Sequence, residues 1–204
     1  NAIEASPVPW IAAMHGTVLG GGFEIALSCA FRLALPDTRF GMPEVNIGII
    51  PGAGGTQRLP RLAGVETAAD IICSGGMFPA EKMLEAGIVD VLVDDLDGAV
   101  TAFADMLPLI PEPVSQRPVE NPGSEWFAAK RAELEKKAKG QLSPVQALEA
   151  IEWAATLPFS DGQQRERERF LELRTSEQSK ALRHAFFAER QAAKPELIRG
   201  AEAK

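Results

Sequence analysis

The sequence has few of the residues that build metal sites and disulfide frameworks. Only two cysteines, Cys29 and Cys73, occur among the 204 residues, and both lie among apolar or small neighbours. Their spacing predicts neither a metal site nor a disulfide scaffold, and buried free thiols are expected instead. Such a composition fits a reducing compartment.

An excess of basic charge and a long apolar run are also lacking. The chain carries 21 Lys and Arg against 28 Asp and Glu, a formal net charge of −7, so we expect no nucleic-acid partner. The longest apolar run, near Val8–Leu19, is interrupted by His15 and Gly16 and is too short to span a bilayer. No charged leader with a cleavage site is visible, and the start at Asn1 rather than Met favours a fragment or a processed product.

The composition that is present, 46% hydrophobic and 24% charged, is typical of a globular protein. Residues 1–107 have the alternating pattern of an α/β core. Residues 108–123 contain five prolines and are predicted to form a connector. Residues 124–204 have a helical pattern, so the expected organisation is a partial α/β core, a connector and an all-helical C-terminal segment.

Individual elements follow from local patterns. Pro9–Val18 is predicted as one β-like run, Phe23–Ala30 as a short buried helix and Thr67–Cys73 as a further helix. The segment Ser143–Gln146 is typical of an N-cap serine with a capping-box glutamine. The charge run Arg165–Arg169 is interpreted as a solvated helix face.

Three consecutive glycines, Gly20-Gly21-Gly22, are the first feature with a chemical implication. Without Cβ atoms their backbone N–H groups can approach a ligand closely. If a helix begins there, its N–H groups and dipole suit a developing negative oxygen. The alternative is a tight turn before a buried helix, which the spacing alone favours.

Two acidic residues occur among apolar neighbours, Glu24 after the glycine cluster and Glu44 in a loop bounded by glycines. A carboxylate in such a setting is expected to be buried, and a buried carboxylate needs a partner or acquires a shifted pKa. Each has the alternative reading of a structural ion pair. Two such acids near glycine-rich loops are also what water addition requires, since one deprotonates water while the other supplies a proton.

The segment Pro51–Leu59 superficially resembles a nucleotide-binding loop. It has no Lys-Ser or Lys-Thr as in GxxxxGK[ST], and Gln57 stands where GxGxxG has its third glycine. A helix start that lines a pocket is therefore favoured over a phosphate cradle.

Together these segments resemble the crotonase (enoyl-CoA hydratase/isomerase) superfamily. The similarity lies in Ile11–Glu24, Phe40–Glu44 and Gly48–Leu59, which match three family segments in order and spacing. It covers residues 1–106 closely and implies an α/β, crotonase-like ββα spiral, truncated at its N-terminus.

The resemblance also implies roles for particular residues. Gly21 would donate a backbone N–H to an oxyanion hole for the thioester oxygen. Glu24 would activate the water that attacks C3, and Glu44 would deliver the proton to C2. Gly20 and Gly52 would help to position water or substrate, and no metal is expected. The implied activity is hydration of 2-trans-enoyl-CoA in fatty acid β-oxidation. The alternatives are a Δ3-Δ2-enoyl-CoA isomerase or a non-catalytic CoA-binding protein of the same fold.

The C-terminal part carries a second resemblance, in Ser143–Ala150 and Ser179–Arg190. These segments are similar to the hydratase C-terminal helices and linker helix of bifunctional β-oxidation enzymes, in which a 3-hydroxyacyl-CoA dehydrogenase follows. The resemblance implies an acyl-CoA thioester substrate, no cofactor for hydration, and NAD only for the dehydrogenase domain, which these residues do not reach.

Two further expectations follow from the resemblance. In the family, upstream strands supply the second oxyanion-hole N–H, so residues 1–204 alone are expected to be inactive or weakly active. The expected compartment is the cytoplasm if the source is bacterial and the peroxisome if it is eukaryotic.

Overall fold

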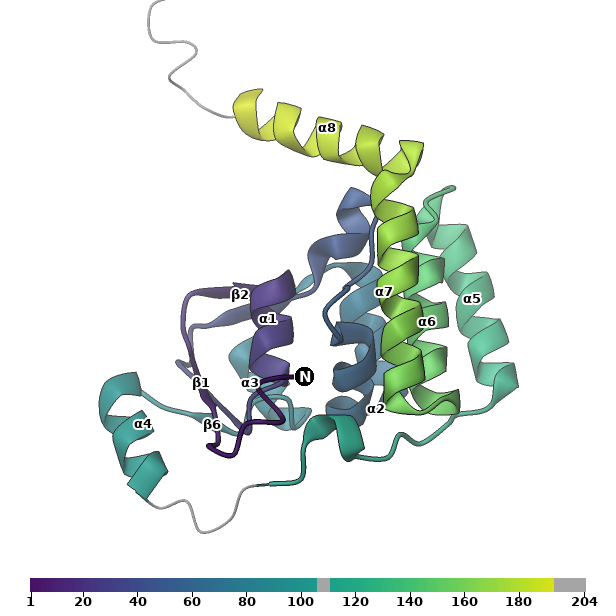
Figure 1. Ribbon diagram of the computed structural model, residues 1–204. Coiled ribbons are helices and arrows are strands. Elements are labelled where there is room, and N and C mark those ends of the chain that lie inside the picture. The colour runs from purple at the N-terminus through teal and green to yellow at the C-terminus, as the bar shows by residue number, and fades with distance from the viewer. Residues whose placement is uncertain (106–110, 193–204) are drawn as a thin grey trace, which may run out of the picture.

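The computed structural model describes residues 1–105 and 111–192, in which two small sheets lie beside a layer of helices (Figure 1). The strands are β1 (Ile11–Met14), β2 (Thr17–Leu19), β3 (Phe31–Ala34), β4 (Arg39–Gly41), β5 (Met77–Pro79) and β6 (Val91–Leu92). The α-helices are α1 (Gly20–Leu27), α2 (Gly55–Ser74), α3 (Ala80–Glu85), α4 (Leu96–Asp105), α5 (Ser124–Ala138), α6 (Ser143–Thr156), α7 (Phe159–Thr175) and α8 (Glu177–Ala192). Two short 3-10 helices are η1 (Pro43–Ile47) and η2 (Val114–Gln116).

Three of the four strand pairings among the described residues are parallel. The first sheet has the order β1-β3-β6 and is parallel throughout, with Ile11 opposite Phe31. The second has the order β2-β4-β5, in which β2 and β4 are parallel and β5 is antiparallel. The connections between parallel strands pass through helices, as parallel pairing requires. The mixed α/β architecture predicted for this part of the chain is confirmed.

The run Pro9–Val18 is not one strand, contrary to the prediction. Gly16 has φ of 64° and turns the chain after Met14, so β1 joins the first sheet and β2 joins the second. Helix α1 then begins directly after β2, at Gly20 rather than at the predicted Phe23. The glycine cluster is therefore the first turn of a helix and not a separate tight turn.

Helix α2 is longer than the predicted Thr67–Cys73 and begins at the glycine-rich loop. Gly64, with φ of 80° and ψ of 165°, interrupts its helical geometry and divides it into two pieces. Leu59 in the first piece and Ile72 in the second have no exposed surface. The helix thus carries the loop at one end and the centre of the hydrophobic core along its length.

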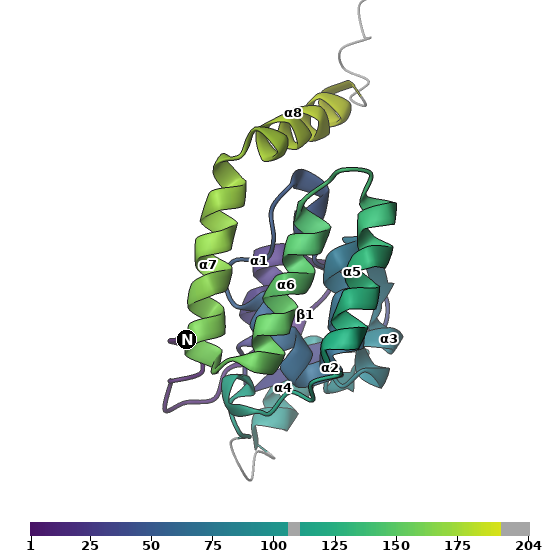
Figure 2. The same ribbon diagram turned by 90° about the vertical axis from the view of Figure 1, so that its right-hand side faces the viewer.

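The C-terminal helices cover α2, with α5, α6 and α7 side by side (Figure 2). Helix α6 packs on α2 through Ala147, Leu148 and Ile151, all of which have no exposed surface. These helices therefore share one core with the α/β part. The division of the chain at residues 107 and 123 stays a prediction, and residues 106–110 lie outside the described part.

The predicted capping box at Ser143 is wrong. Leu142 occupies the cap position of α6, and the Ser143 hydroxyl donates a hydrogen bond of 2.8 Å to the Val45 carbonyl in η1. Ser143 has no exposed surface, so its hydroxyl serves a contact between distant segments rather than its own helix.

Helix α8 leaves the layer of α5 to α7 at an angle (Figure 1). Its first turn docks on η1, where the Ser179 hydroxyl donates to the Ile47 carbonyl at 2.9 Å. Phe187 farther along is 57% exposed. Residues 193–204, where the linker prediction ends, lie outside the described residues. Across the described ranges, no helix combines the length and apolar character needed to cross a membrane.

Arg32 on β3 joins the first sheet to the segment before β6, and this contact generates a prediction. Its side chain is 1% exposed and donates to the Ile88 carbonyl (2.7 Å) and the Cys29 carbonyl (2.8 Å) while pairing with Asp90. We expect Arg32→Met to lower the free energy of unfolding by about 3 kcal/mol, because it leaves buried acceptors unpaired.

Urea denaturation measures this change, with Arg39→Met as the matched control. Arg39 is an exposed arginine on β4, and its replacement should cost no more than about 0.5 kcal/mol. Equal losses in the two variants would show that the contacts of Arg32 contribute nothing specific.

Candidate active site

Glu24 is a buried carboxyl group that the glycine-rich loop before α2 binds. It comes from α1 and is only 5% exposed, as its apolar sequence setting predicted. Its Oε1 atom accepts hydrogen bonds from the backbone N–H groups of Ala53 and Gly55, both at 2.8 Å. Burial raises the pKa of Glu24, and these N–H groups together with the positive charge of Arg58 oppose the rise.

The glycine-rich loop before α2 therefore binds carboxyl groups of the protein itself. Gly54 has φ of 103° and acts as the cap of α2, whose first N–H groups have no partners within the helix. These N–H groups and the helix dipole favour a negative charge. The predicted helix start is confirmed, and the N–H groups that a phosphate would need are occupied by side chains.

Glu44 lies in η1 and is half-buried, not fully buried as its apolar neighbours predicted, and it differs from Glu24 in its hydrogen bonding. Its Oε2 atom is buried and has no hydrogen-bond partner among the described residues. Its Oε1 atom faces Gly20, where an added Cβ would lie 2.6 Å away. Burial, together with the nearby negative charge of Glu24, raises the pKa of Glu44 to about 7. The structure thus brings the two glutamates into electrostatic contact, which sequence spacing could not establish.

The glycines singled out from the sequence surround these acids. Gly21 is exposed in the first turn of α1, and an added Cβ would meet nothing within 4 Å. Its N–H belongs to the first-turn groups that have no acceptor within the helix. Gly52 lines a hollow of about 500 Å³ together with Phe159 and Gln163. An added Cβ there would lie 2.6 Å from the Phe170 ring, so only glycine fits.

A third acid, Glu166 on α7, was missed by the sequence reasoning. It has no exposed surface, and its carboxyl group accepts from Gly54 N–H (2.7 Å), Thr56 N–H (2.9 Å) and the Thr56 hydroxyl (2.5 Å). Burial and the charge of Glu24 raise the pKa of Glu166 to about 8. The prediction that Arg165–Arg169 forms a solvated face is wrong for this residue.

A pattern in α7 could have revealed the burial of Glu166. One face of α7 carries residues that follow one another at intervals of three or four positions. They are Gly162, Glu166, Phe170 and Leu173. The arginines that alternate with the glutamates obscured this stripe.

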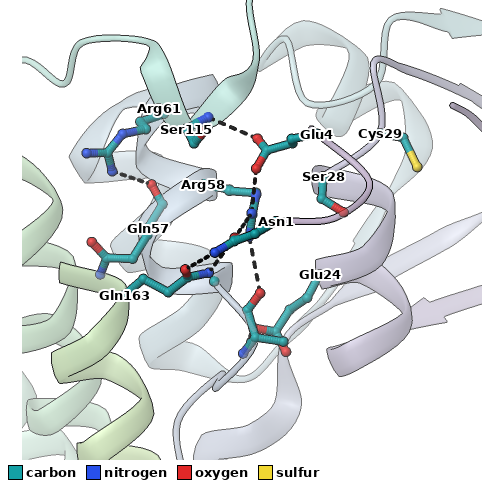
Figure 3. Close-up of polar contacts among 12 residues, drawn as sticks. Asn1, Glu4, Glu24, Ser28, Cys29, Gln57, Arg58, Arg61, Ser115 and Gln163 are labelled. Atoms are coloured by element: carbon teal, nitrogen blue, oxygen red, sulfur yellow. Dashed lines mark hydrogen bonds and ion pairs between the residues drawn. The ribbon is translucent and has the colours of Figure 1, made fainter. Parts of the chain in front are cut away.

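Arg58 supplies the positive charge nearest to these carboxyl groups. Figure 3 shows its side chain between Glu4 and Asn1, and it is 1% exposed. Its Nη2 atom donates to Glu4 Oε2 at 2.6 Å and to Asn1 Oδ1 at 2.9 Å. The other Glu4 oxygen accepts from Ser115 N–H at 3.0 Å. The cation is therefore held by the N-terminal segment, which η2 in turn fixes through Ser115.

The cysteines take no part in this site. Cys29 and Cys73 are both buried free thiols, as predicted. In residues 1–105 and 111–192, no group of three or more His, Cys, Asp or Glu side chains is arranged to hold a metal ion.

The close approach of Gly20 to Glu44 gives a second prediction. Gly20 has φ of 51°, so Gly20→Ala would strain the backbone and push Glu44 Oε1 away. We expect a loss of about 2 kcal/mol in the free energy of unfolding, measured by urea denaturation. Gly22→Ala is the control, because an added Cβ there meets nothing within 4 Å and alanine favours the helix. The prediction is refuted if both alanines have the same effect.

The raised pKa of Glu44 gives a third prediction. Because the folded protein binds this proton more tightly than the unfolded chain, its contribution to stability is present below about pH 4.5 and is lost as the pH rises through 7. Glu44→Gln stays neutral, so its free energy of unfolding relative to wild type should increase by about 2 kcal/mol between pH 5 and pH 8. Urea denaturation at several pH values measures this, with the exposed Glu66→Gln as control. A difference that is constant with pH would contradict the assignment.

Comparisons with known proteins identify the family. The profile of the family described as Enoyl-CoA hydratase/isomerase matches residues 1–107. Two curated relatives, both named peroxisomal bifunctional enzyme, come from Danio rerio and Cavia porcellus. The first is 41% identical over 99% of this chain and 29% of its own length, and the second is 40% identical over 96% and 28%. The chain thus spans less than a third of the length of these relatives.

A solved structure shows the same architecture. The enoyl-CoA hydratase/isomerase from Pseudoalteromonas atlantica T6c superimposes with a TM-score of 0.63 and 25% identity, covering 92% of this chain and 65% of that one. The alignment extends into the C-terminal helices, so the likeness includes more than the segment matched by the family profile. With the three motifs, the paired carboxyl groups and these matches in agreement, the chain belongs to the enoyl-CoA hydratase/isomerase family.

Proposed function

We propose that the protein containing this chain hydrates a 2-trans-enoyl-CoA to a 3-hydroxyacyl-CoA in fatty acid β-oxidation. The observation that carries the proposal is the proximity of two carboxyl groups with different hydrogen bonding. Glu24 is buried and accepts two backbone N–H groups, whereas Glu44 is half-buried, with an Oε2 atom that has no partner among the described residues, and feels the negative charge of Glu24. Carboxyl groups whose environments differ in this way suit separate acid and base roles.

Glu24 has the environment of the base. Backbone N–H groups from the loop before α2 and the charge of Arg58 favour its ionised form against the cost of burial. One oxygen is fixed by Ala53 and Gly55, which leaves the other to accept a proton from a water molecule. The water oxygen would form its bond to C3 as Glu24 takes the proton.

Glu44 has the environment of the acid. A pKa of about 7 keeps a large fraction of this group protonated near neutral pH, and its Oε2 atom has no acceptor or donor among the described residues. Glu44 would give its proton to C2 as the enolate collapses. The thioester then gains OH at C3 and H at C2, and one proton must pass from Glu24 to Glu44 to restore the starting state.

The thioester oxygen becomes negative during this step and needs a donor. The N–H of Gly21, in the first turn of α1, is suited to that role because it has no acceptor within the helix and no neighbouring side chain crowds the Cα of this exposed residue. Gly20 and Gly52 would position water and substrate by keeping side chains away from Glu44 and from the Phe170 ring.

The relatives support a larger context. Their name describes a bifunctional peroxisomal enzyme, and the similarity covers the C-terminal helices as well. We therefore propose that residues 124–204 lead from the partial catalytic core and its connector toward a dehydrogenase in the same protein. NAD would serve only that dehydrogenase, and the hydration itself would use no group beyond the protein and the CoA thioester. The proposed compartment is the peroxisome for a eukaryotic source and the cytoplasm for a bacterial one.

The test is turnover of crotonyl-CoA by the full-length protein and its glutamate variants. Glu24→Gln and Glu44→Gln should each lower kcat by about 10²- to 10⁴-fold, because each removes one proton-transfer group. Glu66→Gln is the control, since Glu66 is an exposed glutamate on α2 and should keep the wild-type rate.

A parallel assay with a 3-enoyl-CoA separates hydratase from isomerase activity. Conversion of the 3-enoyl substrate alone would make the protein an isomerase, in which Glu44 shuttles the proton. Absence of turnover with both substrates would leave a CoA-binding protein of this fold and refute the proposed activity.

A further inference from the structure

We propose that Glu166, which lies in α7 outside the segment matched by the family profile, is a positioning residue that sets the location of Glu24 through a loop that both side chains bind. The catalytic part of this proposal rests on the proposed function. The binding of Glu24 and Glu166 to the same loop rests on the geometry alone.

The two carboxyl groups bind alternate N–H groups of one short segment. Glu24 accepts from Ala53 and Gly55, and Glu166 accepts from Gly54 and Thr56. Successive N–H groups therefore point to opposite sides of the loop, with α1 on one side and α7 on the other. Displacing either carboxyl group moves the peptide planes that hold the other.

A second layer of contacts fixes the direction of the Thr56 hydroxyl. Gln57 Nε2 donates to Thr56 Oγ1 at 2.9 Å and to the Ala150 carbonyl at 2.8 Å. Because the hydroxyl oxygen already accepts from Gln57, its hydrogen is directed toward Glu166, which it reaches at 2.5 Å. Helix α6 thus supports the orientation of Glu166 through two intervening side chains.

The charges around Glu166 make its protonation depend on Glu24. Glu24 faces the same loop and carries the like charge that acts on Glu166, and Glu44 in turn interacts with Glu24. Arg58 on α2 is the cation that acts on Glu24.

The arginines of α7 are directed elsewhere. Arg165 and Arg169 lie over the Trp153 ring and Arg167 lies over the Phe170 ring. Two acids that share one helix N-terminus are expected to titrate as a coupled pair.

The first experiment detects this coupling without any turnover. In the full-length protein labelled with ¹³C at glutamate Cδ, the Glu24 signal is identified by its absence in Glu24→Gln and followed against pH. We expect two steps for wild type, because Glu166 changes its charge during the titration, and one step for Glu166→Gln. Glu168→Gln is the matched control, an exposed glutamate two residues along the same helix, and should keep both steps.

The second experiment measures the kinetic effect. Glu166→Gln should lower kcat for crotonyl-CoA by about ten- to a hundredfold with KM changed by less than about threefold, because the loop and Glu24 move away from the reacting atoms. Glu168→Gln should keep the wild-type kcat. Wild-type kcat in Glu166→Gln, or a Glu24 titration that the substitution does not alter, overturns the proposal.

A pair of milder variants covers the case in which Glu166→Gln does not fold. Thr56→Val removes one donor to the ionised Glu166, so the upper step of the titration should move to higher pH, whereas Thr56→Ser restores the donor and the wild-type curve. Identical curves for the two variants overturn the proposal. If wild type turns over neither enoyl-CoA but shows the two-step titration, the proposed function fails and the pairing of Glu24 with Glu166 stands.

Discussion

The binding of carboxyl groups by the N-terminus of α2 is the constraint on which the rest of the site depends. The backbone N–H groups of Ala53 to Thr56 hold Glu24 from one side and Glu166 from the other. A helix N-terminus ordinarily attracts an external anion, whereas here it organises anions that belong to the protein. The N–H groups at the start of this 20-residue helix need acceptors, and the two buried carboxyl groups need donors. Each supplies what the other needs.

The order of motifs was sufficient to predict much of the fold and to single out Glu24 and Glu44, but not Glu166, among the three clustered acids. Burial of Glu24 followed from its apolar neighbours, and the helix start at Gly55 followed from the glycine-rich loop. Glu166 escaped because burial of an acid depends on partners about 110 residues away in sequence, which local charge patterning does not reveal. The same reason explains Ser143, whose hydroxyl serves the Val45 carbonyl instead of its own helix.

The helical segment is part of the core rather than an appendage. Leu148 and Ile151 of α6 pack with Leu59 and Ile72 of α2 in one continuous cluster. Because Glu166 of α7 also binds the loop before α2, the segment matched by the family profile contains only part of the contacts that hold this loop. The end of the family match at residue 107 therefore does not coincide with an end of the hydrophobic core.

Gly162 shows how this arrangement changes the interpretation of natural variants. By helix propensity alone, alanine at this position in α7 would be counted as harmless or stabilising, by up to about 1 kcal/mol. The structure reverses that expectation, because an added methyl group would collide with Gln57 Oε1 beneath the helix. A single additional carbon on the outer helix layer would thus push on the Gln57 side chain that orients Thr56, and a substitution usually classed as benign would act on the Glu166 carboxyl group, which its own side chain never touches.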